Sequence, residues 1–331
     1  MNDEFFRSKV VIVTGAAGFI GSHLCDKLLE LGAKVHGLDN LITGQESNLS
    51  EAKKNQNFSF HQVDLNDEQA TLAVLQKIQA EDGLDAVLHF ASPASPPLYQ
   101  RWPTQTYLVN TLALHNLLTW LKENVPASRL LFAGTSEAYG TPLEHPQKET
   151  YWGNVNPNGP RSCYDEAKRL GETICGVFYR DFDFDTRIVR IFNTYGPRMS
   201  LADGRILPQF IKEYLANEKL TIYGDGSQTR SYCYIDDLVR GILTFLAAPD
   251  LAGETINLGN PHEFTVLETA KIFNEAVGRP DDDFQYLCLP KDDPTRRQPD
   301  ITKAQKLLQY RPTVEFRDGL KLMIASYKKE N

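Results

Sequence analysis

Residues 10–21 impose the strongest constraint on how this chain of 331 residues can fold. Four β-branched residues at 10–13 predict a buried strand, and the glycine loop 15–21 (GAAGFIG) follows it, ahead of a helical pattern over 22–31. Glycines at a strand-to-helix turn let the backbone approach a phosphate group, which the positive end of the helix attracts. An ordinary tight turn would need the same glycines. The place between the first strand and the first helix favours a dinucleotide-binding loop, although its spacing is G-x-x-G-x-x-G.

The first half of the chain alternates short β-branched runs with helical patterns. Such alternation is typical of a parallel sheet that is covered by helices on both faces. We therefore predict an α/β fold with a Rossmann-type, doubly wound parallel sheet. The predicted strands are 10–13, 34–38, 57–63, 86–89, 130–133 and 186–191, and the predicted helices are 22–31, 70–78, 106–121 and 162–179.

After Gly196 the rhythm changes, because prolines divide the chain into shorter pieces. We predict a smaller C-terminal substrate domain that is interleaved with the first domain. The dinucleotide-binding domain is expected to hold residues 1–196 and about 231–259, since 231–247 and 254–259 can return to the large sheet. Residues 197–230 and 260–331 are then expected to form the substrate domain.

Composition and charge exclude several classes of protein. A net charge of −8 argues against a nucleic-acid-binding surface, which needs a basic face. The five cysteines are widely spaced and never form C-x-x-C, so neither a disulfide framework nor a metal site is expected. No apolar run approaches the roughly 20 residues of a membrane span, and the first strand leaves no room for a signal peptide. A cytoplasmic protein is expected.

The second predicted strand ends in Asp39, at the position where a dinucleotide-binding fold has an acidic residue. A carboxylate at this place accepts hydrogen bonds from the adenosine ribose hydroxyls and repels a 2′-phosphate, so NAD is favoured over NADP. Asp64 and Leu65, after the third strand, are predicted adenine contacts, with a helix N-cap as the alternative for Asp64. The predicted cofactor-binding residues are Gly15, Gly18, Phe19, Ile20, Gly21, Asp39, Asn40, Thr43, Asp64, Leu65, Ala91, Tyr164 and Lys168.

Tyr164 and Lys168 begin a helical pattern four residues apart, which places them on one face of a helix. A cationic lysine beside a phenol favours the phenolate, so we expect Lys168 to lower the pKa of Tyr164 and make it a general base. A solvated helix face would show the same spacing. Thr135, Ser136 and Glu137 follow the fifth strand, whose carboxyl end faces the ligand crevice in such a sheet. The alternative for this trio is a helix cap with an acidic first turn.

Longer segments are more specific than these residues. Together they resemble the extended short-chain dehydrogenase/reductase family, and within it the UDP-glucuronic acid decarboxylases. The resemblance covers essentially the whole chain. The segments that carry it are 88–97 (LHFASPASPP), 135–140 (TSEAYG), 145–147 (HPQ), 151–157 (YWGNVNP), 159–166 (GPRSCYDE), 190–199 (RIFNTYGPRM), 203–205 (DGR), 226–230 (GSQTR), 292–294 (DDP) and 297–300 (RQPD).

The resemblance implies an NAD-dependent lyase that converts UDP-glucuronate to UDP-xylose. NAD oxidises C4 of the sugar, the 4-keto acid loses its carboxylate, and C4 is reduced again, so that bound NAD is recycled. The implied catalytic residues are Thr135, Ser136, Glu137, Tyr164, Lys168 and Arg297. The implied substrate-binding residues are Ser92, Pro93, Glu137, Asn193, Arg198, Arg205, Tyr223, Arg230 and Arg297. Arg296 is a further candidate cation. Taken singly, each arginine could be a surface ion pair and Tyr223 a strand core residue.

The resemblance leaves some alternatives open. Leu108 stands where the decarboxylases carry a lysine, so the substrate pocket is less certain than the cofactor site. A UDP-uronate 4-epimerase or a nucleotide-sugar 4,6-dehydratase on the same scaffold is the alternative enzyme, and an NAD-binding sensor is the alternative of another class. Release of a 4-keto pentose in place of UDP-xylose is also open. Relatives pair through the elements at 106–121 and 162–179, which implies a homodimer.

Overall fold

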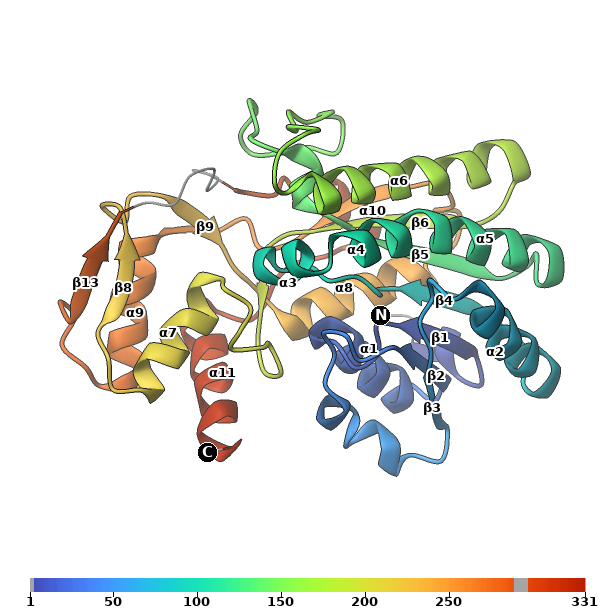
Figure 1. Cartoon of the computed structure of the whole chain (residues 1–331), viewed down its shortest axis with the longest axis horizontal. Coiled ribbons are helices and arrows are strands. Elements are labelled where there is room, and N and C mark those ends of the chain that lie inside the picture. Colours follow the sequence, from blue (N-terminus) through green and yellow to red (C-terminus); the bar gives the residue numbers. More distant parts are fainter. Residues whose placement is uncertain (1–2, 289–296, 331) are drawn as a thin grey trace.

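The computed structural model describes residues 3–288 and 297–330, and a seven-stranded parallel sheet forms its centre (Figure 1). The strand order is β11-β6-β5-β4-β1-β2-β3. The chain adds β2 and β3 on one side of β1 and then β4, β5, β6 and β11 on the other side, which is the order of a doubly wound fold. The strands are β1 (Val10–Thr14), β2 (Lys34–Asp39), β3 (Phe58–Gln62), β4 (Ala86–His89), β5 (Arg129–Thr135), β6 (Thr186–Ile191) and β11 (Thr255–Leu258).

Helices cover both faces of this sheet (Figure 1). Successive side chains of β1 point to opposite faces, so Val11 packs in one hydrophobic cluster and Ile12 in the other. The first cluster includes helices α1 (Phe19–Glu30) and α8 (Ile235–Ala247). The helices of the second face are α2 (Glu68–Glu81), α4 (Pro103–Asn110), α5 (Leu112–Asn124) and α6 (Ser162–Phe182), with α3 (Pro96–Arg101) leading into α4.

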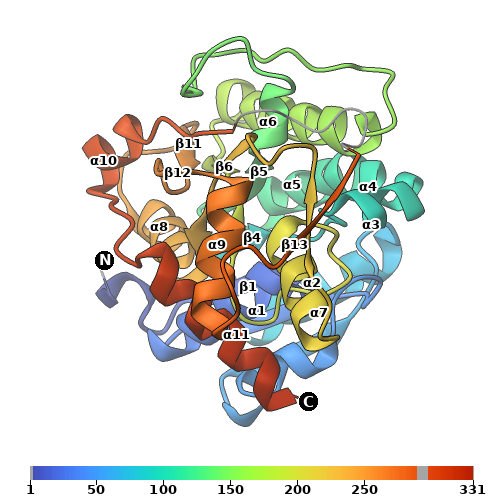
Figure 2. The same ribbon diagram turned by 90° about the vertical axis from the view of Figure 1, so that its left-hand side faces the viewer.

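A smaller lobe lies beside the carboxyl ends of the strands (Figures 1 and 2). It is built around three two-stranded pairings, β10 with β7, β12 with β9 and β13 with β8. Its elements are β7 (Thr194–Tyr195), α7 (Ile206–Leu215), β8 (Leu220–Tyr223), β9 (Thr229–Ser231), β10 (Cys233–Tyr234), β12 (Glu263–Thr265), α9 (Val266–Val277), β13 (Phe284–Leu287) and α11 (Phe316–Glu330). Helix α10 (Thr302–Leu308) lies against β11, and the 3₁₀ helices are η1 (Asp3–Phe6), η2 (Glu46–Leu49), η3 (Ala52–Lys54) and η4 (Ser136–Tyr139).

The predicted α/β class and parallel sheet are confirmed, and all six predicted strands are present. Two helix predictions need correction. The first helix begins at Phe19 rather than at 22, so the last glycine of the loop already lies inside it. The helix predicted over 106–121 is two helices, α4 and α5, which meet at Thr111. At the break Thr111 has φ −125° and ψ −81°, and the His89 ring contacts the Val109 carbonyl at 3.1 Å.

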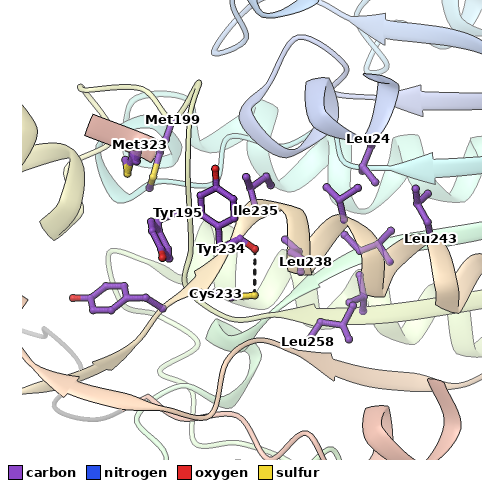
Figure 3. Packing of buried hydrophobic residues seen from close by; sticks show 14 of the residues in the cluster. Leu24, Tyr195, Met199, Cys233, Tyr234, Ile235, Leu238, Leu243, Leu258 and Met323 are labelled. Carbon is purple, nitrogen blue, oxygen red and sulfur yellow. Dashed lines mark hydrogen bonds between the residues drawn. The ribbon is translucent and has the colours of Figure 1, made fainter. Parts of the chain in front are cut away.

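Residues 231–259 return to the large sheet in two ways. Strand β11 joins its edge, and α8 covers a face beside α1, while β10 pairs with β7 in the lobe. One hydrophobic cluster runs without a break from Leu24 of α1 through Leu238 of α8 to Met323 of α11 (Figure 3). The domain boundaries given above therefore stay a prediction. None of the helices in the described ranges is long and apolar enough to cross a lipid bilayer.

Arg187 gives a testable contribution to stability, because this arginine of β6 is 1% exposed. Its Nη1 donates to three carbonyls at the end of α8, including that of Ala248 at 2.7 Å, and its Nε donates to Asp185 at 2.8 Å. Replacing Arg187 by methionine leaves the Phe245 carbonyl without its side-chain donor, and it leaves the Leu246 and Ala248 carbonyls and Asp185 with Arg129 alone. We expect the free energy of unfolding to fall by about 2–3 kcal/mol, measured by urea denaturation.

Arg129→Met is the matched control, since Arg129 also donates to the Leu246 carbonyl (2.8 Å) but is partly exposed. A loss in Arg187→Met no larger than that in Arg129→Met would contradict the prediction.

Candidate active site

The carboxyl ends of the central strands open into three cavities that share lining residues. The central cavity, of about 290 Å³, lies between the glycine loop, the end of β5 and the start of α6. The β2 cavity, of about 70 Å³, lies beside Asp39 and shares Gly15 and Ser92 with the central cavity. The lobe cavity, of about 350 Å³, is lined largely by the smaller lobe and shares Arg205 and Arg230 with the central cavity. The three form one continuous crevice.

The glycine loop is a backbone cradle in which side chains have no room. Gly15 has φ +70°, and a Cβ atom there would lie 2.7 Å from the Phe90 carbonyl oxygen. A Cβ atom on Gly21 would lie 2.0 Å from the Gly15 carbonyl oxygen. Gly18 is the N-cap of α1 and offers no side-chain acceptor to the first amides of the helix. These amides therefore face the crevice and suit an anionic group such as a pyrophosphate.

Asp39 ends β2 at the rim of the β2 cavity. Its Oδ2 accepts from the Ala17 amide at 2.9 Å and its Oδ1 from the Leu41 amide at 2.7 Å. The two bonds fix the carboxylate against the glycine loop. Each oxygen keeps a second lone pair that can accept from a ribose hydroxyl, so this pair of acceptors suits a dinucleotide without a 2′-phosphate.

The structure places every residue predicted for the site on the wall of at least one cavity. Pro93 lies in the β2 cavity, on the side of the predicted cofactor residues rather than with the sugar. Asp64 does not cap α2, because Asp67 is the N-cap and Asp64 accepts from the Asn66 amide at 2.9 Å. Arg296 lies outside the described residues.

Arg198 lies closer to the cofactor loop than the resemblance implies. Its Nη2 pairs with Asp26 of α1 at 2.7 Å, and it lines the central cavity together with Gly18 and Phe19. It does not line the lobe cavity, where the other predicted nucleotide contacts Asn193, Arg205, Tyr223 and Arg230 lie.

Tyr164, Thr135 and Lys168 meet in the central cavity. Tyr164 is 5% exposed and its hydroxyl is hydrogen-bonded to Thr135. Thr135 caps η4 through a bond from the Glu137 amide (3.2 Å), so the capping interpretation and a role in the crevice are both compatible with its position. The Lys168 Nζ donates to the Ala133 carbonyl at 2.7 Å and lies 5.8 Å from the centre of the Tyr164 ring.

The prediction that Lys168 lowers the pKa of Tyr164 is wrong when only the protein residues are considered. Burial raises the pKa of Tyr164 to about 12, and the groups that oppose this rise are Thr135 and Arg205. Burial also lowers the pKa of Lys168 to about 7, so this lysine is only partly charged at neutral pH. Desolvation is the largest cause of both shifts, because both groups are buried beside the crevice.

Glu137 is surrounded by arginines. Its Oε2 accepts from Arg297 at 2.9 Å and from Arg161. Burial favours the neutral carboxyl group, but Arg297, Arg161, Arg230 and Arg205 outweigh burial and hold the pKa of Glu137 below its usual value. The carboxylate is therefore ionised, and the arginines around it form a cationic wall that suits an anionic ligand.

Two arginines of this wall are fixed by the chain itself. The Arg205 guanidinium binds Asp203 through Nε at 2.5 Å and Nη2 at 2.8 Å. Arg230 is buried and donates to the Thr229 carbonyl at 2.9 Å.

Tyr99 and Arg161 are among the crevice residues that the sequence analysis missed. Tyr99 of α3 is buried and stacks on Tyr164 with ring centres 5.0 Å apart and an interplanar angle of 8°. Its hydroxyl has no hydrogen-bond partner within the described part of the chain, and Tyr99 lines the central cavity. Both residues fall within or next to the conspicuous segments 88–97 and 159–166, which is the signal that could have found them.

Comparison with known proteins agrees with this geometry. A sequence profile of the NAD dependent epimerase/dehydratase family matches residues 11–259. The chain belongs to this family. The match spans the glycine loop, Asp39, the Thr135 to Lys168 region and β11.

Individual relatives narrow the comparison. The chain is 44% identical to UDP-glucuronic acid decarboxylase 2 of Arabidopsis thaliana over 96% of its own length and 68% of the relative. It is 41% identical to UDP-glucuronic acid decarboxylase 1 of Xenopus tropicalis over 97% of its own length and 73% of the relative. Among solved structures, UDP-glucuronic acid 4-epimerase from Bacillus cereus, in complex with UDP-glucuronic acid and NAD, has a TM-score of 0.84 at 30% identity. The match covers 97% of this chain and 100% of that one.

NAD is the cofactor of this family, and the glycine cradle and Asp39 suit it. Asp39→Asn should keep the shape of the side chain but remove the charge that repels a 2′-phosphate. We expect the preference for NAD over NADP, measured as a ratio of dissociation constants by calorimetry, to fall about tenfold. Asp67→Asn, at the N-cap of α2 outside the cavities, is the control and should leave the ratio unchanged. An unchanged ratio in Asp39→Asn would show that Asp39 does not select the cofactor.

Proposed function

We propose that this protein is a UDP-glucuronate decarboxylase, which converts UDP-glucuronate and a proton to UDP-xylose and carbon dioxide. The observation that carries the proposal is the arginine wall around an ionised Glu137 next to Tyr164, at the junction of the two larger cavities. A diphosphate and a sugar carboxylate both need such cations, and arginine binds these oxyanions through paired N–H groups. The likeness to decarboxylases along nearly the whole chain supports the same reaction.

The glycine loop, Asp39 and the β2 cavity hold NAD, and Arg198 contributes from the same side. Bound NAD supplies the redox chemistry at C4 of the sugar. Tyr164 takes the proton of the C4 hydroxyl, with Thr135 in hydrogen-bond contact, and the same pair stabilises the oxygen of the enolate after carbon dioxide has left. Burial by the protein alone disfavours the phenolate, so formation of the base needs cations in the loaded crevice, which the charged form of Lys168 and the positive nicotinamide of bound NAD would supply.

The lobe cavity receives the UDP group through Asn193, Arg205, Arg230 and Tyr223. Arg297 holds the sugar carboxylate. The ionised Glu137 orients Arg297 and the donor of the proton that is added to C5. Ser92 and Ser136 line the central cavity where the sugar lies. Loss of the carboxylate from a 4-keto acid leaves an electron pair that the carbonyl accepts, so no metal ion is required.

The test is incubation of the purified protein with UDP-glucuronate and NAD, followed by measurement of released carbon dioxide and proton NMR of the product. A UDP-pentose with stoichiometric carbon dioxide is the expected result. An epimerised hexuronate without carbon dioxide would identify the 4-epimerase alternative, and a free 4-keto pentose would show that the last reduction does not occur on this enzyme.

A homodimer completes the proposal. Helices α4, α5 and α6 expose large apolar side chains, of which Leu112 is 55% and Leu170 49% exposed. Pairing of these helices between two copies would bury them. Leu170→Glu is expected to convert a dimer into a monomer in light scattering after gel filtration. Leu143→Glu, an equally apolar but distant loop position, is the control. A monomeric unmodified protein would contradict the dimer.

A cytoplasmic location stays a prediction of the sequence.

A further inference from the structure

Gln147 is a fully buried polar residue outside the three cavities, although it lies in a loop that is otherwise largely exposed. It belongs to the segment 145–147 (HPQ), to which the resemblance gives no role. A buried amide keeps its place only when its hydrogen bonds are satisfied, so its partners show what the residue does.

The Gln147 Nε2 donates to the Glu144 carbonyl at 2.8 Å in its own loop, and the other partners described next lie on the segment that carries Arg297. The backbone N–H of Gln147 donates to the backbone carbonyl of Gln298 at 2.9 Å. The backbone N–H of Asp300 donates to the backbone carbonyl of Gln147 at 2.9 Å. The Gln298 amide donates to Gln147 Oε1 at 3.0 Å, so the side chain adds a third bond to the two of the backbone. We name these three bonds the Gln147 clamp.

The clamp is anchored in the sheet. Asn257 of β11, itself fully buried, donates from Nδ2 to the Gln147 carbonyl at 3.0 Å and to the Asp300 carbonyl at 3.2 Å. The Tyr139 hydroxyl donates to Asn257 Oδ1 at 2.7 Å. Residues 298–300 are thereby tied to the large sheet, at Asp300 directly and at Gln298 through Gln147.

Arg297, directly before the clamp, is 2% exposed and held on every side. Ser231 Oγ donates to its carbonyl at 3.1 Å. Its Nη1 donates to the carbonyls of Ser136 and Gly140, each at 2.9 Å, and its Nη2 donates to Glu137. Of the five N–H groups of a guanidinium, the Nε–H and one Nη2 hydrogen have no acceptor among residues 3–288 and 297–330.

We propose that Gln147 is the positioning residue of Arg297: the clamp sets the backbone at 298 so that the remaining guanidinium N–H groups meet the carboxylate of the sugar. This inference rests on the proposed function, and it adds a residue that acts through Arg297 without touching the ligand. A displacement of about 1 Å of such a group can lower a rate about 100-fold, so the clamp determines how well the carboxylate is held.

The experiment compares Gln147→Met, which keeps the buried volume but removes the side-chain acceptor, with the unmodified holoenzyme. Dissociation constants for UDP-glucuronate, UDP-glucose and UDP are measured by calorimetry, together with the rate of carbon dioxide release. The same measurements are made in Arg297→Ala and in the double variant. Gln298→Ala is the matched control, because it removes a side-chain bond of 2.8 Å to the Pro261 carbonyl on the same segment and leaves the clamp intact.

We expect Gln147→Met to lower carbon dioxide release about 10- to 100-fold and the preference for UDP-glucuronate over UDP-glucose about tenfold, with UDP affinity unchanged. In the Arg297→Ala background the same substitution should change neither quantity by more than about twofold, since the two residues act as one unit. Gln298→Ala should match the unmodified protein.

Two results would overturn the proposal: an unchanged substrate preference in Gln147→Met, or effects of Gln147→Met and Arg297→Ala that simply multiply in the double variant. If Gln147 had a structural role alone, Gln147→Met would lower the melting temperature and leave the preference for UDP-glucuronate over UDP-glucose unchanged, which is the first of these two results. If Gln147→Met does not fold, Gln147→Ala is measured in the same cycle. Absence of carbon dioxide release in the unmodified protein would contradict the proposed function instead, while the binding preference would still test the clamp.

Discussion

Replacement of Tyr164 by phenylalanine is expected to lower the rate of carbon dioxide release about 10³-fold, the range of a lost general base. The ring would keep its stack on Tyr99, and only a hydroxyl that is bonded to Thr135 would be lost. UDP affinity should therefore stay within about twofold, because the effect falls on the reaction and not on ground-state binding. The measurements are carbon dioxide release and calorimetric titration with UDP.

Tyr234→Phe is the matched control for this prediction. Tyr234 is equally buried, but it lies in β10 and lines none of the three cavities. It should retain the rate of the unmodified protein. A Tyr164→Phe variant that kept more than a tenth of the rate would show that another group takes the C4 proton, and Tyr99, with its buried hydroxyl in the same cavity, would be the first candidate.

The fold was predictable because its signals are local. Each strand of the central sheet is a short run bounded by turn or helical segments, from VVIVT in β1 to RLLFAGT in β5, and the loop before Phe19 has the glycines that a close backbone approach requires. What the local pattern did not predict is the break at Thr111, which carries no Gly or Pro signal and lies beside a tertiary contact, that of His89 with the Val109 carbonyl 20 residues later in the chain.

The residues of the site were predictable from the longer sequence segments, but the pKa values that burial gives them were not. The spacing of Tyr164 and Lys168 shows that they share a helix face, yet it says nothing of how deeply the helix is buried, and burial decides both pKa values. Contacts between distant segments were missed for the same reason. Gln147 and Arg297 are 150 residues apart, and only the tertiary structure brings the clamp together.

Lys168 provides the second large effect, on stability and rate together. Replacing it by methionine should lower carbon dioxide release about 100-fold, since the phenolate of Tyr164 loses its nearest cation on α6. The same substitution should raise the free energy of unfolding by about 1–2 kcal/mol at pH 6, because relief from desolvating an ammonium group that is 3% exposed exceeds the loss of its hydrogen bond to the Ala133 carbonyl.

The pH dependence of this gain distinguishes desolvation from better packing. In the folded protein burial lowers the pKa of Lys168 to about 7, against 10.5 for an ordinary lysine. Between these values the unfolded chain holds a proton that the folded chain has released, so the stability of the unmodified protein rises with pH across this window. The gain in free energy of unfolding of Lys168→Met should accordingly be greatest at and below pH 7 and vanish toward pH 10.5.

Urea denaturation at pH 6, 8 and 10 measures this gain, with Lys27→Met on α1 as the exposed control. A gain that is equal at all three values would assign the effect to packing and would leave Lys168 charged inside the crevice.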